Sequence, residues 1–134
     1  MNGFGTGLKM VAAFLGAWWL GLPGLVQVLI LLMALDMVAG VVRATADRKL
    51  SSDVMFTGVT KKVMVLLLVG MAHLIEPYVA GLPLGSAAAG YYVAHEALSI
   101  TENVVAAGLP VPQWLKNALV KLQEIPGKKT GEEK

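Results

Sequence analysis

Residues 10–35 read MVAAFLGAWWLGLPGLVQVLILLMAL and contain no charged side chain. The whole chain of 134 residues is 56% hydrophobic and only 15% charged, with a mean hydropathy of +0.66. Soluble domains carry about a quarter charged residues, so this composition predicts an integral membrane protein. The GLPG at 21–24 interrupts the run, because a proline flanked by glycines favours a turn. We therefore expect a helix on each side of it.

Four hydrophobic segments approach the length of about 20 residues that a membrane span needs. The expected fold is an all-α membrane protein: a small bundle of four, alternatively three, transmembrane helices plus a short amphipathic C-terminal helix. The first segment is short, but Trp18 and Trp19 suit the headgroup level. A cleavable signal peptide is its alternative, although only Lys9 marks a basic region and no Ala-x-Ala site follows. The expected spans are about 8–22, 25–46, 63–80 and 86–107, within a transmembrane domain of residues 1–108.

The eleven Lys and Arg residues are distributed unevenly along the chain. Five lie from Arg43 to Lys62, five follow from Lys116 onward, and the connections GLPG and GLPLGS have none. By the positive-inside rule, the basic connection and the C-terminal tail face the cytoplasm. The residues expected to give this orientation are Arg48, Lys49, Lys61 and Lys62. With four crossings the N-terminus is also cytoplasmic; with three it lies outside.

Residues 109–134 are expected to form a cytoplasmic tail with an amphipathic helix over 113–125. Pro112 suits the start of this helix, and Pro126 with Gly127 stops it. Its apolar side chains, including Trp114, share one face. Lys116 and Lys121 lie on the other face. The pattern is typical of a helix on the inner membrane surface, where lysines meet anionic lipid, and equally of a helix packed on the bundle.

The fourth span is unusually polar. At about 100° per residue, one arc of a helical wheel collects Tyr92, His95, Glu96, Ser99, Glu102 and Asn103. The opposite side includes Gly90, Ala94, Ala97 and Thr101. The second span places Asp36, Gly40, Arg43 and Asp47 on one stripe, and the third places Lys62, His73 and Glu76 on another. Three spans therefore carry a polar stripe.

An ionised group at the bilayer centre costs about 2.5–3.5 kcal/mol or more, so these side chains face protein or water. A single polar residue often only joins helices through a hydrogen bond. Two carboxylates on one face instead need protonation, a cation or water. Arg43 is a candidate partner for Asp47 or Asp36, or its side chain extends to the membrane surface. The candidates for a pore or oligomer surface are Asp36, Arg43, His73, Glu76, Tyr92, His95, Glu96, Ser99, Glu102 and Asn103.

Small residues on the same helices allow close helix approach, inside one copy or between copies. These helix-packing candidates are Gly40, Ala44, Gly90, Ala94 and Ala97.

Several activities do not fit the sequence. There is no cysteine, and a net charge of +2 gives no case for binding nucleic acid. HEALS at 95–99 begins like a zinc-protease motif, but Ser99 stands where the second His ligand would be. No nucleophile elbow is visible. We expect no enzyme activity, no metal and no cofactor.

Five segments in order carry a resemblance to a known family: LLMALDMVAGVVRA, KLSS, GVTKK, HEALSITEN and GLPVPQWLKNAL. Over about residues 28–122 the chain resembles the toxin-secretion/phage-lysis family of bacteriophage holins. Ala39 departs from a hydroxyl residue that often precedes the glycine of the family's Asp-x-x-x-Gly segment. That difference puts a hydrogen bond between helices in doubt without affecting Asp36 or Gly40.

The resemblance implies a multi-pass protein of the bacterial inner (cytoplasmic) membrane that forms homo-oligomers and permeabilises the lipid bilayer. An endolysin or a toxin would be the exported cargo, and an antiholin is a further partner. The alternatives are a small proton-coupled transporter, in which an intramembrane Glu is the coupling site, and a noncatalytic membrane scaffold subunit. The polar residues cluster late in the chain and no internal repeat is apparent, which favours the holin hypothesis.

Four crossings predict that reporters fused after Met1 and after Lys134 are both cytoplasmic, because the basic segments stay inside. Activity of paired periplasmic and cytoplasmic reporters measures this. A periplasmic N-terminus with a cytoplasmic C-terminus would reject the first crossing and leave three.

Overall fold

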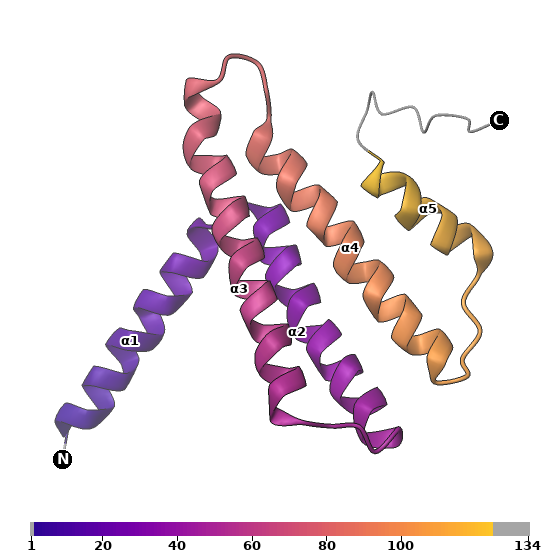
Figure 1. Ribbon diagram of the computed structural model, residues 1–134. Helices are drawn as coiled ribbons and strands as arrows, with labels where there is room; N and C mark the ends of the chain where they lie inside the picture. Colours follow the sequence, from indigo (N-terminus) through magenta and orange to yellow (C-terminus); the bar gives the residue numbers. More distant parts are fainter. Residues whose placement is uncertain (1, 125–134) are drawn as a thin grey trace.

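The computed structural model describes residues 2–124, and all of its regular structure is helical (Figure 1). Residue 1 and residues 125–134 lie outside the described part, so the tail expected beyond Glu124 is not covered. The predicted all-α class is confirmed. The elements are α1 (Asn2–Gly21), α2 (Gly24–Ala46), α3 (Ser52–Ile75), the short 3₁₀ helix η1 (Glu76–Tyr78), α4 (Leu84–Ala106) and α5 (Gln113–Gln123).

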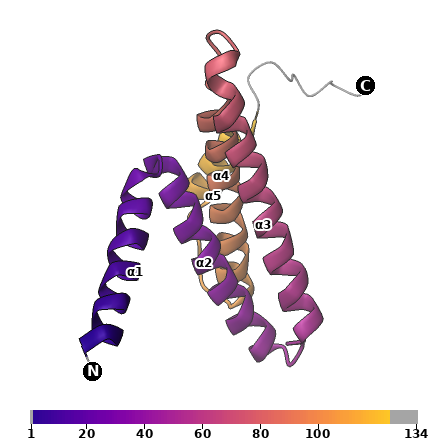
Figure 2. The ribbon, with the colours of Figure 1, turned by 90° about the vertical axis from the view of Figure 1, so that its left-hand side faces the viewer.

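The turn at GLPG separates α1 from α2 as the proline and glycines predict. Pro23 precedes α2, and its carbonyl accepts hydrogen bonds from Val26 N at 2.9 Å and Gln27 N at 3.1 Å. The side-chain amide of Gln27 donates to Trp19 O at 2.7 Å, which satisfies a carbonyl at the end of α1. This bond helps to fix the angle at which α1 leaves the bundle. Figure 2 shows that angle from the side.

Helix α3 begins at Ser52, well before the expected span at 63–80. The Ser51 hydroxyl caps it by accepting a hydrogen bond from Val54 N at 3.3 Å, and Asp53 lies in its first turn. Both features favour a helix start, and hydropathy alone does not detect them. Lys61 and Lys62 therefore belong to α3, while Arg48 and Lys49 remain in the connection.

The connection from α2 to α3 is correspondingly short. Arg48 has φ 53°, the left-handed conformation that often ends a helix. Two hydrogen bonds close the turn, from Arg48 N to Thr45 O at 3.1 Å and from Lys49 N to Ala44 O at 2.8 Å.

Helix α4 is the central element: α2 and α3 pack on one side of it and α5 on the other (Figure 1). The core consists of Leu29 and Met33 from α2, Val69 from α3 and Ala89 from α4. Ala94 is also fully buried, so this predicted helix-packing residue is used within one copy. The other four predicted packing residues, Gly40, Ala44, Gly90 and Ala97, are half-buried.

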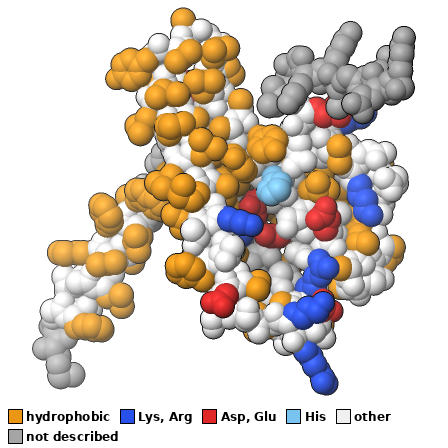
Figure 3. Space-filling model, in the orientation of Figure 1, with side chains coloured by type: hydrophobic (Ala, Val, Ile, Leu, Met, Phe, Trp, Pro, Cys, Tyr) orange, Lys and Arg blue, Asp and Glu red, His pale blue; other side chains and the backbone are white. Residues whose placement is uncertain are grey.

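Helices α2 and α3 are long and apolar enough to cross a membrane, and little of either apolar window is buried in the bundle. Hydrophobic side chains cover α1 and the upper part of α3, whereas charged side chains gather toward α4, α5 and the lower end (Figure 3). Such an exposed apolar surface suits lipid. Two spans are thus supported by length and composition, and the expected four are not confirmed.

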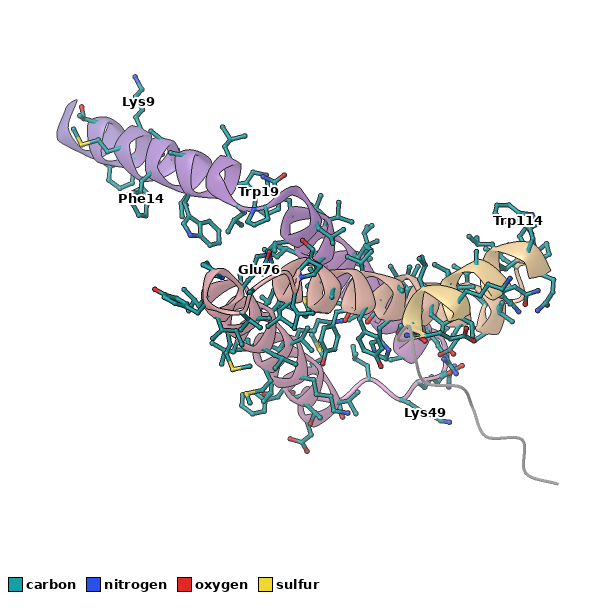
Figure 4. All side chains as sticks on the ribbon, turned by 90° about the horizontal axis from the view of Figure 1, so that it is seen from above. Lys9, Phe14, Trp19, Lys49, Glu76 and Trp114 are labelled. Carbon is teal, nitrogen blue, oxygen red and sulfur yellow. The ribbon has the colours of Figure 1, made fainter. Side chains whose placement is uncertain are left out.

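Helix α5 runs back alongside α4, with Leu115 and Leu119 half-buried and a bond from Gln123 to His95 at 3.3 Å. The predicted apolar face is divided. Trp114 is 69% exposed and points away from the bundle (Figure 4), and Leu122 is exposed as well. Lys116 is half-buried and Lys121 is exposed. This arrangement matches the packed alternative, with part of the apolar surface left uncovered.

Candidate functional site

Three helices meet at a charged cluster formed by Asp36, Lys62 and Glu96, which we call the Lys62 cluster. The Lys62 ammonium donates to Asp36 Oδ2 at 2.9 Å and to Glu96 Oε2. The side chains of Lys62, Asp36 and Glu96 are 15%, 16% and 6% exposed, so the cluster lies largely inside the bundle. One cation from α3 thus joins a carboxylate of α2 to a carboxylate of α4.

Polar contacts extend the cluster toward the lower end of the bundle. Asn103 reaches Asp36 Oδ1 at 3.5 Å, and the Arg43 guanidinium donates to Asn103 Oδ1 at 3.3 Å. Arg43 also lies 3.9 Å from Asp47. Arg43 and Asp47 are about half exposed, and exposed ion pairs contribute little stability. Of the two partners expected for Arg43, the structure selects Asp47 and adds Asn103.

The register of the turns explains why these residues meet. Asp36 and Lys62 are equally far from Lys49 in the sequence, one before it and one after it, so an antiparallel pair of helices brings them to one level. The α3–α4 connection then returns the chain so that Glu96 reaches the same level. Two things therefore bring the cluster together: the positions of the connections between the helices, and the helix face on which each residue lies.

Burial gives the cluster its energetic importance. Charges removed from water lose several kcal/mol of solvation each, and only good pairing offsets that loss. Lys62 pairs with two carboxylates at once, so the cluster holds one more formal negative charge than positive. It holds the helices together only while Lys62 stays in place.

The polar arc predicted on α4 is split in the structure. Glu96 is buried, Tyr92, Ser99 and Asn103 are half-buried, and His95 and Glu102 are exposed. Thr101, expected on the opposite side, is buried and bonds to Ala97 O at 2.8 Å. The cause is that α4 packs on two sides, because α5 covers the side turned away from α2 and α3. The arc therefore faces more than one neighbour: Glu96 and Asn103 reach α2 and α3, whereas His95 bonds to Gln123 of α5.

Glu102 and Lys116 line a cleft between α4 and α5 together with Arg43. This cleft is open and mixed in polarity, and its lining does not include the Lys62 cluster. Lys116, expected at the lipid surface, thus lines the same cleft as a carboxylate.

His73 of α3 and Glu76 of η1 lie on the same side as Lys62 but far from it along the helix axis, at the α3–α4 connection. Glu76 Oε2 accepts from Gly85 N at 2.7 Å, and His73 Nδ1 lies 2.9 Å from Val69 O. Only glycine fits at 85, because a Cβ there would come within 2.4 Å of the His73 ring. Figure 4 shows Glu76 at this end of the bundle. These residues close a turn and take no part in the cluster.

A groove with a volume of about 180 Å³ runs between α2 and α3, with Asp36 and Lys62 among its lining residues. The rest of its lining is mostly apolar or small and includes Met37, Gly40, Ala44, Met55 and Gly58. Added Cβ atoms at Gly40 and Gly58 would meet nothing within 4 Å. The groove is therefore open, and it exposes part of the charged cluster.

The sequence placed Lys62 with the orientation signal and on the polar stripe of the third span, but it did not identify Lys62 as the residue that joins Asp36 to Glu96. Two features of the sequence could have identified Lys62. The Ser51 cap places Lys62 inside a helix, and Lys62 is as far from the α2–α3 connection as Asp36 is on the other side. Among residues 2–124, no group of three or more His, Asp or Glu side chains is positioned to hold a metal.

Replacing Lys62 with Met should lower the unfolding free energy in detergent by about 3 kcal/mol, since Asp36 and Glu96 lose their shared cation inside the bundle. Lys61→Met is the matched control, because Lys61 is the neighbouring lysine and is exposed. Denaturant titration followed by circular dichroism measures both. Equal losses for the two variants would show that Lys62 has no special role in stability.

Comparison with known proteins gives a consistent result. Residues 12–124 match the model of the bacteriophage holin family. An uncharacterized protein of Halalkalibacterium halodurans is 32% identical over 119 residues, covering 84% of this chain and 85% of that protein. An uncharacterized Listeria monocytogenes protein is 36% identical over 102 residues, covering 72% of this chain and 69% of that protein. A probable holin of Bacillus phage phi105 is 28% identical over 105 residues, covering 78% of each chain.

No solved structure matches this chain. The family match covers α2 to α5 and half of α1, and so includes all three residues of the Lys62 cluster. Together with the two apolar helices, it identifies a membrane protein. The chain belongs to the bacteriophage holin family.

Proposed function

We propose that this protein oligomerises in the bacterial cytoplasmic membrane and permeabilises it, so that an endolysin or a toxin can leave the cell. The observation that carries the proposal is the Lys62 cluster: three ionisable side chains enclosed between α4 and the helices α2 and α3, whose outer surfaces are apolar. Ionisable residues within spanning helices face protein or a water-filled path. In one copy they face each other, and in an oligomer they can face water.

The proposed mechanism depends on the small core and the open groove. Four buried core positions hold the bundle together, while most of the apolar side chains on α2 and α3 point outward. Such a bundle can exchange contacts within one copy for contacts between copies at modest cost. Once the cluster residues border a shared path, hydration lowers the cost of their charges and stabilises the open form.

The proposed arrangement has four crossings, formed by α1 to α4, with the basic α2–α3 connection and the start of α5 on the cytoplasmic side. Figures 1 and 2 support it, because the N-terminus, the α2–α3 connection and the end of α4 lie toward one end of the molecule. The opposite end carries the uncharged η1–α4 connection. An antiholin would be a further partner in timing.

A proton-coupled transporter is the second candidate, because Glu96 is only 4% exposed within the bundle. The two functions differ in what the carboxylate controls. In a transporter, Glu96→Gln abolishes substrate-dependent proton flux. In a permeabilising protein, it changes the time at which the membrane fails.

Expression of this protein alone in a bacterial host should collapse the membrane potential and reduce viability, and co-expression of a cytoplasmic muralytic enzyme should then give lysis. Glu96→Gln should shift the lysis time, since it removes one charge of the cluster while keeping its shape. Potential-sensitive dye fluorescence and culture turbidity are the measurements. Full accumulation in the membrane without loss of potential or lysis would reject the proposed function.

A further inference from the structure

Helix α1 has almost no contact with its own bundle. From Gly3 to Gly21 every residue except Trp19 is exposed, and Phe4 is 86% exposed. Figures 1 and 2 show α1 as an arm that diverges from α2. Lipid tails can cover its apolar side chains but cannot pair with the charge of Lys9, which has no hydrogen-bond or ion-pair partner within residues 2–124.

The two faces of α1 differ in size. Side chains within about 60° of Lys9 on the helical wheel include the small residues Gly5, Thr6, Ala12, Ala13 and Gly16. Leu20, close to the turn, is the large exception on this face. The opposite face carries Phe4, Val11, Phe14 and Trp18. Small residues let helices approach closely in membranes, so the Lys9 face suits protein and the bulky face suits lipid.

The level of Lys9 matches that of the Lys62 cluster. Lys9 and Asp36 are almost equally far from Pro23 in the sequence, one before it and one after it. At about 1.5 Å per residue both are about 20 Å from the turn along their helices. Copies that share one membrane therefore place Lys9 of one near the depth of Asp36 in another.

The groove between α2 and α3 offers a complementary surface at that depth. Its lining includes the small residues Gly40, Ala44 and Gly58, and Asp36 and Lys62 also line it. The Lys62 cluster has two carboxylates and one ammonium, so a second cation would balance it. Lys9 is the only charged residue of α1.

The orientation of α1 favours a neighbour's groove over its own. Lys9 points away from the bundle and Phe14 projects from the other side of α1 (Figure 4). Trp18 of the bulky face borders the upper part of the α2–α3 face. The bond from Gln27 to Trp19 O holds this orientation. Closing α1 onto its own bundle would thus present the wrong face.

We propose that α1 of one copy docks in the α2–α3 groove of a second copy, small face inward, with Lys9 beside Asp36. This interface rests on the proposed function, since it names the contact through which the permeabilising oligomer forms. Each copy inserts its α1 into the groove of one neighbour and receives the α1 of another neighbour in its own groove. The contact is therefore head-to-tail and can propagate beyond a dimer.

Cysteine cross-linking between two differently tagged chains tests the interface, because the natural chain has no cysteine. One chain carries Gly5→Cys and the other carries Gly40→Cys; the two positions have matching depths, since they are almost equally far from Pro23 on either side of it. Phe4→Cys replaces Gly5→Cys as the control, at nearly the same depth on the opposite face. Copper-phenanthroline oxidation of isolated membranes, followed by non-reducing gels, detects the mixed dimer.

The mixed dimer should be strong with Gly5→Cys and weak with Phe4→Cys. Adding Lys9→Gln to the arm-donating chain should lower its yield about ten-fold, which corresponds to about 1.4 kcal/mol, while Lys49→Gln should not. A chain with both cysteines that cross-links only within itself would overturn the proposal in favour of its own α1. Equal yields for positions 4 and 5 would also overturn it.

The same strains separate this inference from the proposed function. Lysis without a mixed dimer would reject the interface and leave membrane permeabilisation intact. A mixed dimer at position 5 without loss of membrane potential would support the interface and reject the proposed function.

Discussion

One ammonium shared between two carboxylates is the interaction on which the bundle depends. Lys62 joins Asp36 of α2 to Glu96 of α4. Apart from this cluster, α2 and α3 pack mainly on α4, with an open groove between them. The apolar core is small, and its side chains make no directional polar contacts that would fix how the helices align. The ionic cluster therefore sets which helix faces meet and at what level, because a shift of one turn in any of the three helices would leave a charge unpaired inside the bundle.

The same dependence supports the proposed exchange of contacts within one copy for contacts between copies. A buried ion pair often contributes little net stability, since desolvation offsets the attraction, and its best-attested role is to specify one arrangement. Here the arrangement is specified in one copy, and the unbalanced carboxylate and the open groove leave a place for another cation. Under the proposed function, single copies stay harmless and the assembly permeabilises the membrane, and both properties serve that change. The proposed docking of α1 supplies the cation and covers the groove together.

Much of the fold could be predicted from hydropathy and from Pro and Gly. The ends of α4 and α5 fall within two residues of the expected 86–107 and 113–125. The start of α3 was placed too late, because the apolar run begins at Val63 whereas the helix is capped at Ser51. Lys62 was consequently counted with the topology signal, although the helical wheel also placed it on the polar stripe of the third span. Contacts between helices are harder to predict, since a wheel says which residues share a face but not which neighbour covers it. Thus His95 bonds to Gln123 of α5, whereas Glu96 accepts a hydrogen bond from Lys62 of α3.

The central claim is that Lys62 and Glu96 are energetically coupled inside the bundle. A double-mutant cycle with Lys62→Met, Glu96→Gln and the combined variant measures that coupling as a difference of unfolding free energies in detergent. The account predicts that the double variant loses less stability than the two single losses combined, with a coupling of about 1–3 kcal/mol for residues in one network. Additive losses would contradict it, because they would mean that the two charges do not hold the helices through each other.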